Sequence, residues 1–486
     1  MKKRSLGFNA FLNGFRNVLN LIFPLITFPY VSRVLSVQGI GINNFSSTYV
    51  NYFVLIAGLG INTYAIREGA KFRNNKKIIS KFSSQMFSIN MLSTFCAYLL
   101  LILTLLIFAN LRNYILCILI YSLQIFFTTI GTEWIYTIYE DFSYITLRSI
   151  VFKIISIILL FIFVKNEGDY LVYAGITVLA TVGSNTLNYL HAKSLVQIKL
   201  TKKLNLKEHL KPILIIFATA ITSTIYVSSD NTMLGLLKND YSVGLYSVSV
   251  KIYGMVSGLV TSGLAVTLPR LAMLYGQKRI REFNNIFFKT YNVLNLMALP
   301  SIFGLIMTSK DVILIISGKK YLSSVITLQI IAVALIFSVF SWFISSCVLI
   351  PAKREKQVLY SLIICSFVNV ILNFILIPTW SYNAAAVTTV ISELLSMILM
   401  IYYAWDIIKD TILDKRVWLN LLSVFIGCIG IICTCWLVNI YIKPLLFHFV
   451  VSVILSILNY FVILMILKNS FILDIFNKFK VRFKIR

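Results

Sequence analysis

The feature that most constrains this chain is a succession of apolar runs, each about 20 residues long. A helix of that length crosses the hydrocarbon core of a bilayer. Residues 90–108, 150–164 and 451–467 carry at most one charged side chain each. Only 13% of the 486 residues are charged and 59% are hydrophobic, which leaves too few polar groups to cover a soluble domain. The chain is therefore predicted to be an all-α integral membrane protein.

About fourteen transmembrane helices are predicted, joined by loops too short to fold as separate domains. They are placed at about 8–30, 43–65, 84–108, 114–136, 144–164, 169–190, 212–235, 243–266, 283–308, 325–349, 357–378, 383–405, 418–438 and 445–467. The last residues, 469–486, mix Phe and Ile with Lys and Arg. This tail is predicted to lie on the cytoplasmic membrane surface.

The distribution of basic residues predicts the orientation of the helices. The chain has 44 Lys and Arg against 17 Asp and Glu, a net charge of +27. If the N-terminus is placed inside, the inner segments hold 32 of these bases, the outer segments 8 and the helices 4. Because cytoplasmic loops of membrane proteins are rich in Lys and Arg, this split predicts that both termini are cytoplasmic. The charge is better explained in this way than by nucleic-acid binding.

The chain contains a weak internal repeat, of a kind common in transporters. A shift of 203 residues overlays three landmark pairs, Gly41 with Gly244, Gly60 with Gly263 and Arg67 with Arg270. It also overlays the predicted helices 8–30 and 212–235. We therefore expect two pseudo-symmetric lobes of six helices, 1–205 and 206–410. Residues 411–486 would add two further helices and the basic tail.

Polar stripes mark these two overlaid helices. One face of the first carries Asn9, Asn13, Arg16, Asn17 and Asn20, and one face of the second carries Thr219, Thr222, Ser223, Tyr226 and Asp230. Such faces avoid lipid, so they line either a wet cavity or a contact between helices. The cavity is favoured because Arg16 needs water or an anion.

Four basic residues fall inside predicted helices: Arg16, Lys153, Lys251 and Lys289. A base in the middle of the bilayer is costly, and a lumen with surplus positive charge suits an anionic substrate such as a diphosphate. Two alternatives stay open. Lys251 can pair with Glu393, and Lys289 can extend its ammonium group to the interface. Glu393 can instead carry a coupling ion, H⁺ or Na⁺.

Signals of enzymatic chemistry are absent from the sequence. No phosphate-binding Gly-Lys-Ser/Thr loop and no pair of carboxylates outside the spans is present. The seven cysteines lie in apolar runs, so neither disulfides nor a metal site is expected. His191 and His209 fall among lysines of an inner segment and are expected to be solvated. No cofactor is expected.

Three stretches resemble one known family. They are residues 24–41, beginning Pro-Leu-Ile-Thr-Phe-Pro-Tyr; residues 131–153, beginning Gly-Thr-Glu-Trp-Ile-Tyr; and residues 377–386, from Ile-Pro to Asn-Ala-Ala-Ala. They are similar to bacterial O-antigen and capsule repeat-unit flippases. These form the polysaccharide branch of the multidrug/oligosaccharidyl-lipid/polysaccharide exporter superfamily. The resemblance covers about residues 5–410, and the second stretch is its most specific part.

This resemblance implies a fold and a function. The two lobes would form a V, and the chain would flip an undecaprenyl-diphosphate-linked oligosaccharide across the bacterial inner membrane by alternating access. A polysaccharide polymerase and a chain-length regulator are candidate partners. Substrate-binding candidates are Asn13, Arg16, Asn17, Asn20, Lys153, Lys251 and Lys289. Gating or coupling candidates are Arg33, Arg67, Asp230, Arg270 and Glu393.

Two other functions make different predictions. A drug or small-molecule antiporter of the same fold should have more acids than bases in its lumen, because drugs are usually cationic. A membrane polysaccharide polymerase should carry catalytic residues on a large outer loop, whereas the longest outer segment predicted here is 309–324. The sequence shows neither feature, so a flippase fits it better than either alternative.

Overall fold

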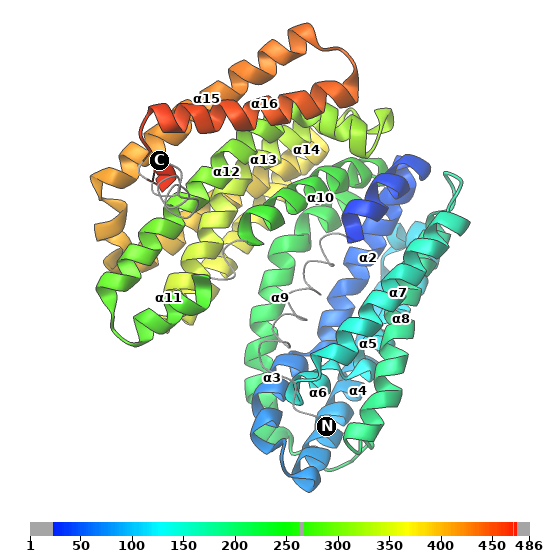
Figure 1. Ribbon diagram of the computed structural model, residues 1–486. Coiled ribbons are helices and arrows are strands. Elements are labelled where there is room, and N and C mark those ends of the chain that lie inside the picture. The colour runs from blue at the N-terminus through cyan, green and yellow to red at the C-terminus, as the bar shows by residue number, and fades with distance from the viewer. Residues whose placement is uncertain (1–22, 263–266, 470, 474–486) are drawn as a thin grey trace. The chain divides into compact units, whose positions relative to one another are not determined.

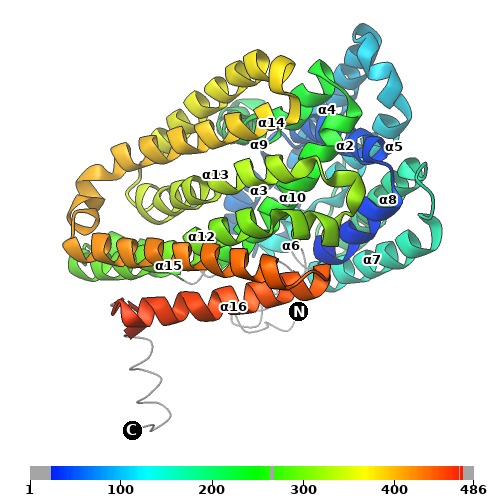
Figure 2. The same ribbon diagram turned by 90° about the horizontal axis from the view of Figure 1, so that it is seen from above.

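The structure is a computed structural model that describes residues 23–262, 267–469 and 471–473. Within these ranges the regular elements are all helices. The chain divides into two compact units, Met1–Gly244 (unit 1) and Leu245–Arg486 (unit 2). Figures 1 and 2 show the helices of both units in two views. These units follow spatial contact, whereas the predicted lobes 1–205 and 206–410 follow the repeat, so the two divisions differ.

Unit 1 is built from long helices broken by short turns. Residues 23–34 are helical. They are followed by α2 (Val37–Gly58), α3 (Ile61–Gly69), α4 (Lys76–Ile107), α5 (Ile115–Gly131), α6 (Glu133–Ile138), α7 (Phe142–Phe163), α8 (Tyr170–Leu195), α9 (Leu206–Leu237) and the start of α10 (Asp240–Ser262), with 3-10 turns at Ala70–Phe72 and Ala109–Tyr114.

Two helices predicted to be continuous are each divided in the structure. The helix expected at 43–65 is broken at Leu59 and Gly60, which have φ angles of 45° and 73°. The helix expected at 114–136 is broken at Thr132, with a φ of 40°. At Gly60 a side chain would lie 3.0 Å from the backbone nitrogen of Phe217 on α9, so a glycine permits this approach. Hydropathy does not reveal such breaks, because the apolar pattern continues through them.

Unit 2 contains the rest of α10 and six further helices. These are α11 (Thr267–Gly276), α12 (Ile280–Ile316), α13 (Ser324–Ile344), α14 (Glu355–Ile412), α15 (Lys415–Tyr441) and α16 (Leu445–Ile466), with a 3-10 turn at Lys319–Tyr321 and a π turn at Ser345–Leu349. The sequence predicted a basic inner loop where α11 lies. This short helix buries Leu271 and Leu274 in the core of unit 2 and leaves Arg270 exposed.

The helix count agrees with the prediction of about fourteen spans. Twelve helices in the described ranges are long and apolar enough to cross a membrane. One of them, α14, contains Ser381 with φ 53° and ψ −133°, which divides its 58 residues into two arms. These arms correspond to the predicted helices at 357–378 and 383–405. Most of the predicted first helix falls in residues 1–22, outside the described part.

The repeat appears in the structure as a reciprocal contact within unit 1. A side chain at Gly41 of α2 would overlap the backbone of Asp240, and one at Gly244 would overlap the backbone of Val37. Asp240 follows Val37 by 203 residues, and Gly244 follows Gly41 by the same number. The first turns of α2 and α10 therefore meet through equivalent positions. This is the pattern that a pseudo-twofold relation produces, and it has the offset found in the sequence.

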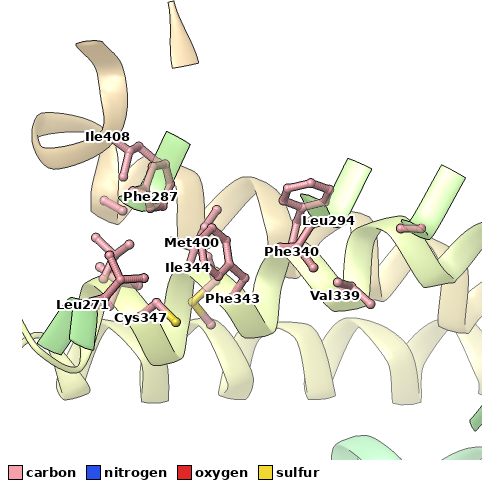
Figure 3. Close-up of a cluster of buried hydrophobic side chains, with 14 of the residues drawn as sticks. Leu271, Phe287, Leu294, Val339, Phe340, Phe343, Ile344, Cys347, Met400 and Ile408 are labelled. Atoms are coloured by element: carbon pink, nitrogen blue, oxygen red, sulfur yellow. The ribbon is translucent and has the colours of Figure 1, made fainter. Parts of the chain in front are cut away.

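The core of unit 2 is centred on α13. Figure 3 shows side chains of α12, α13 and α14 gathered in one cluster. The rings of Phe287 and Phe343 stack with their centroids 5.0 Å apart. Met400 and Ile408 of α14 are almost fully buried in the same cluster. Close packing of this kind holds helices together in a bilayer, where lipid is as apolar as the side chains themselves.

Candidate functional site

The helix α9 is little buried along its middle, where it carries a row of hydroxyl side chains among exposed apolar ones. Thr219 and Ser223 are exposed, and only 6% of the most apolar stretch of α9 is buried, against 22–56% for the other eleven candidate spans of the described chain. The hydroxyls of Thr219, Thr222 and Thr224 donate hydrogen bonds to carbonyl oxygens four residues earlier in α9, at 3.2, 2.8 and 2.9 Å. Because their own helix satisfies these donors, no neighbouring helix is needed to satisfy them.

Both ends of α9 are anchored in unit 1, in contrast to its middle. Near its end, the Tyr52 and Thr232 hydroxyls lie 3.0 Å apart, and Gly235 lies so close to Phe45 that a side chain would collide with the ring. Near its start, His209 lies between α3 and α4. Between these two ends α9 also approaches Gly60 at Phe217, while Thr219 and Ser223 stay exposed.

His209 is buried, which corrects the expectation that it is solvated. Only 4% of the residue is exposed. Its Nδ1 lies 2.9 Å from the Tyr64 hydroxyl and its Nε2 lies 3.4 Å from the Gln85 side-chain oxygen. The flanking Lys207 and Lys211 are exposed. The lysines gave the segment a polar appearance, but the helical register turns position 209 inward.

The predicted intramembrane lysines occupy different environments. Lys153 on α7 is half-buried, and its ammonium group lies 5.6 Å from the centroid of the Phe23 ring, within reach of a cation–π interaction. Lys251 on α10 is also half-buried. Lys289 on α12 is exposed. Lys153 belongs to unit 1 and the other two lysines belong to unit 2.

The structure adds a buried base that the sequence analysis assigned to an inner segment. Arg148 lies in the second turn of α7 and is only 7% exposed. Its guanidinium donates a 2.9 Å hydrogen bond to the Ser184 carbonyl of α8. One turn earlier, the Tyr144 ring stacks on His191, with centroids 4.1 Å apart. The sequence signal for this site was present, because Arg148 lies inside the most specific family-like stretch.

Among the gating and coupling candidates, the three bases are exposed and the two acids are buried or half-buried. Arg33, Arg67 and Arg270 are exposed, and Arg67 pairs with the adjacent Glu68 at 3.1 Å. Asp230 on α9 is 5% exposed and lies near Tyr52 of α2. Glu393 on α14 is half-buried and lies near Tyr253 of α10 and Cys365 of the other α14 arm.

A buried polar network that the sequence analysis missed joins the two arms of α14. The Asn373 side-chain nitrogen donates to the Asn369 side-chain oxygen at 3.0 Å, and the Thr388 hydroxyl donates to the Asn373 side-chain oxygen at 2.5 Å. All three residues are at most 2% exposed. The two asparagines within an apolar run were the available signal, but only the turn at Ser381 brings Thr388 to them.

Four of the predicted substrate-binding residues, Asn13, Arg16, Asn17 and Asn20, lie outside the described residues. In the ranges that the structure does describe, no group of three or more His, Cys, Asp or Glu side chains could hold a metal ion. The candidate residues therefore form two separate sets, one in each unit. Unit 1 holds Lys153, Arg148 and α9, and unit 2 holds Lys251, Glu393 and the α14 network.

Known proteins resemble the chain in both sequence and fold. Over 395 residues it is 24% identical to a candidate O-antigen transporter of Escherichia coli K12, covering 79% of this chain and 93% of that protein. A candidate O-antigen transporter of Shigella dysenteriae is 23% identical over 79% of this chain and 96% of its own length. The solved structure of the lipid II flippase MurJ, in an inward closed conformation, superposes with a TM-score of 0.76 at 17% identity, covering 96% of this chain and 99% of that chain.

At this identity the likeness to MurJ shows a shared fold alone. The family follows from a separate match. Residues 6–275, more than half of the chain, fit the family model described as polysaccharide biosynthesis protein. The resemblance to polysaccharide flippases that the sequence predicted is thereby confirmed. The chain is a multi-pass membrane transporter that belongs to the polysaccharide biosynthesis protein family.

Proposed function

We propose that this protein flips an undecaprenyl-diphosphate-linked oligosaccharide from the cytoplasmic to the outer leaflet of the bacterial inner membrane. The family match and the O-antigen transporters among its relatives support a lipid-linked saccharide as the substrate. The MurJ fold supports the proposal that the chain is a flippase. The product would serve surface polysaccharide assembly, with a polymerase and a chain-length regulator as partners.

The observation that carries this proposal is the pair of half-buried lysines inside membrane spans, Lys153 and Lys251. Arg148 adds a third base on the same helix as Lys153. Moving a diphosphate through a neutral region of low dielectric would leave its charge unpaired, at a cost of several kcal/mol or more. Helix-borne bases offset that cost, and Lys and Arg both bind phosphate oxygens well.

The saccharide and the lipid tail make different demands on the protein. The oligosaccharide needs a hydrophilic path. The exposed hydroxyls of α9 support such a path, because their oxygens can accept hydrogen bonds from water and sugar hydroxyls while donating within the helix. The polyprenyl tail needs no protein enclosure, because the bilayer already solvates it. In this mechanism the charged head group enters the lumen while the tail stays in lipid, and the transporter alternates between access to the two leaflets.

The coupling ion in this proposal is H⁺ or Na⁺, carried at Asp230 or Glu393. Both carboxylates lie within candidate spans, where an ionisable group is expensive and usually functional. The expected result for Glu393→Gln is export that no longer responds to a pH or Na⁺ gradient. The measurement is uptake of labelled substrate into proteoliposomes with each gradient imposed in turn. A gradient response equal to that of the wild type would remove Glu393 from the coupling role.

Neutralising the lysines tests whether a positively charged lumen binds the anionic substrate. Lys153→Gln and Lys251→Gln should each reduce substrate flipping by about tenfold or more, because each loses a charge–phosphate interaction of roughly 1.5–3 kcal/mol. Lys→Arg at the same positions should keep most of the activity. Lys165→Gln is the matched control, since Lys165 is exposed in the loop after α7. The measurement is flipping of a fluorescent lipid-linked oligosaccharide in proteoliposomes, normalised to protein content. Normal flipping by the Lys153→Gln, Lys251→Gln double variant would contradict the proposal.

Cross-linking tests alternating access separately from charge. Cysteines replacing Asn20 and Ser223, in a background without the native cysteines, should form a disulfide in one transport state only. Oxidation should stop flipping and reduction should restore it. A pair that never cross-links, or that cross-links without affecting flipping, would show that these two faces do not border a shared moving path.

A further inference from the structure

The connector between α8 and α9, residues 196–205, is irregular in backbone but held firmly to α4. Ser84 of α4 donates to the Gln197 carbonyl at 3.3 Å and accepts from the Lys199 amide at 3.2 Å. The Thr201 amide donates to the Ser88 hydroxyl at 2.9 Å, and the Gln85 side chain donates to the Lys203 carbonyl at 3.1 Å. Four hydrogen bonds from little more than one helical turn therefore fix the path of the connector.

Burial along the connector fixes which side chains face outward. Val196 and Ile198 are 3% and 8% exposed and pack into the hydrophobic core of unit 1. Beyond the connector, His209 is buried between Tyr64 and Gln85. With these positions turned inward, the lysines of the connector and of the first turn of α9 are directed away from the core.

The outward residues combine positive charge with apolar side chains. Four lysines, Lys199, Lys202, Lys203 and Lys207, are exposed. Leu200 and Leu206, between them in sequence, are 69% and 40% exposed. We call these six residues the connector patch. Among the described residues no ion pair joins its lysines to an acid. A shallow hollow of about 510 Å³ lies at one end of the patch, lined by Lys202, Leu206 and Lys207 of the patch and by one acid, Glu208, among others.

Further lysines lie on the helix that holds the connector. Lys76, Lys77 and Lys81 are exposed in the first two turns of α4, the helix whose Ser84 and Ser88 bind the connector. The predicted topology places all of these residues on the cytoplasmic side. Loop lysines that only set orientation need no fixed backbone and no exposed leucines. Here both features are present.

We infer that the connector patch is a docking surface for anionic phospholipid head groups of the cytoplasmic leaflet. Lysines attract the phosphates, and Leu200 and Leu206 enter the boundary between head groups and acyl chains, as in other basic amphipathic membrane-binding segments. A soluble anion would gain nothing from the leucines, which favours the lipid surface over free phosphate. Since the hydrogen bonds to α4 already order the connector, binding costs little conformational entropy.

The test measures lipid selectivity around the patch in full-length protein. A fluorophore is placed on a cysteine replacing Asn205, in a background without the native cysteines, and the protein is reconstituted in phosphatidylcholine. Quenching by brominated phosphatidylglycerol is compared with quenching by brominated phosphatidylcholine. Each lysine near an anionic surface contributes about fivefold to binding. We expect a phosphatidylglycerol preference of about tenfold or more that weakens as salt is raised.

Four variants test separately the charge of the patch, the hydrogen bonds that hold the connector, and the net charge of the cytoplasmic side. Changing all four patch lysines to Gln should reduce the preference to near one, whereas changing them to Arg should keep it. The matched control removes four exposed charges elsewhere on the predicted cytoplasmic side, through Lys278→Gln, Lys353→Gln, Lys356→Gln and Lys415→Gln, and should keep the preference. The Ser84→Ala, Ser88→Ala variant keeps every lysine but loosens the connector and should lower the preference severalfold.

Three outcomes would overturn the inference. The first is a phosphatidylglycerol preference in the patch Lys→Gln variant equal to that of the wild type. The second is an equal loss in the control variant, which would show a response to net charge alone. The third is full competition by inorganic phosphate at constant ionic strength, which would identify a small-anion site instead of a lipid surface. None of these readouts depends on transport, so the inference stands or falls separately from the proposed function.

Discussion

Two apolar helices, α9 in unit 1 and α13 in unit 2, differ in how much of their length is buried against other helices. The most apolar stretch of α9 has a mean hydropathy of 1.7 and is 6% buried. The corresponding stretch of α13 with its π turn, Ser324–Leu349, has a mean hydropathy of 2.3 and is 56% buried. Both are apolar enough to cross a membrane, yet only α13 is packed along its whole length.

The difference shows that hydropathy and packing are separate properties in a membrane protein. Lipid is as apolar as Leu, so the hydrophobic effect inserts a helix without deciding which helices it contacts. Helix α13 carries small residues such as Ala332, Ala334 and Ser341, which let its neighbours approach closely. Helix α9 has close contacts at its ends, as at Gly235, and a polar face between them. The packing of α13 suits a structural support. The exposed hydroxyls of α9 suit a surface that contacts the substrate of the proposed function.

The largest expected effect on stability comes from the packed helix. Phe343→Ala removes the ring that stacks on Phe287 and should lower the free energy of unfolding by about 3–5 kcal/mol, because the residues that line the new cavity lose their dispersion contacts. The adjacent Trp342 is 40% exposed, so Trp342→Ala should change stability by less than about 1 kcal/mol. Thermal unfolding in detergent compares the two. Equal losses would mean that α13 is not the packed scaffold described here.

A smaller loss is expected at the reciprocal contact near the end of α9. Gly41→Ala places a methyl group against the backbone of Asp240 and should cost about 1–2 kcal/mol, because neither backbone can yield easily. Gly58→Ala in the same helix meets nothing within 4 Å and should be neutral or stabilising by up to about 1 kcal/mol. Thermal unfolding in detergent compares the stability of the two variants. If both changes behave alike, the close contact between α2 and α10 does not constrain the fold.

The smallest effect on stability is expected in the middle of α9. The Thr219→Val, Ser223→Ala variant should change the free energy of unfolding by less than about 0.5 kcal/mol, since both residues are exposed. Flipping of lipid-linked oligosaccharide should nevertheless fall severalfold, because the hydrophilic face is lost. Unfolding and flipping are measured on the same preparation. A destabilised variant with normal flipping would reverse the roles assigned to the two helices.

Much of the architecture could be predicted from local sequence. The two arms of α14 were expected at 357–378 and 383–405, and the structure divides the helix at Ser381. The offset of 203 residues reappears in the paired contacts of Gly41 and Gly244. These features could be found because insertion depends on the length and polarity of single segments, and because repeats keep their landmarks.

The candidate site was harder to predict. Lys153 could be named, because a base in an apolar run is visible in the sequence. The burial of His209 and Arg148 was missed, because it depends on which face of each helix meets a neighbour. The network of Asn369, Asn373 and Thr388 joins two helical arms through side chains, and no single run predicts it. The four polar candidates of the first helix stay predictions.

The sequence by itself therefore determined that this is a membrane protein with about fourteen helices, an internal repeat and intramembrane bases. The helices and the intramembrane bases could be found because insertion depends on the free energy of moving one segment from water into lipid. The repeat could be found because its two copies keep the same landmark residues. Only the tertiary structure decided where helices break, as at Thr132, and which polar groups are satisfied within the protein. It also decided which surfaces are held in place, as Ser84 and Ser88 hold the α8–α9 connector. Those outcomes depend on close contacts between segments far apart in the chain, and such contacts leave no regular period in the sequence.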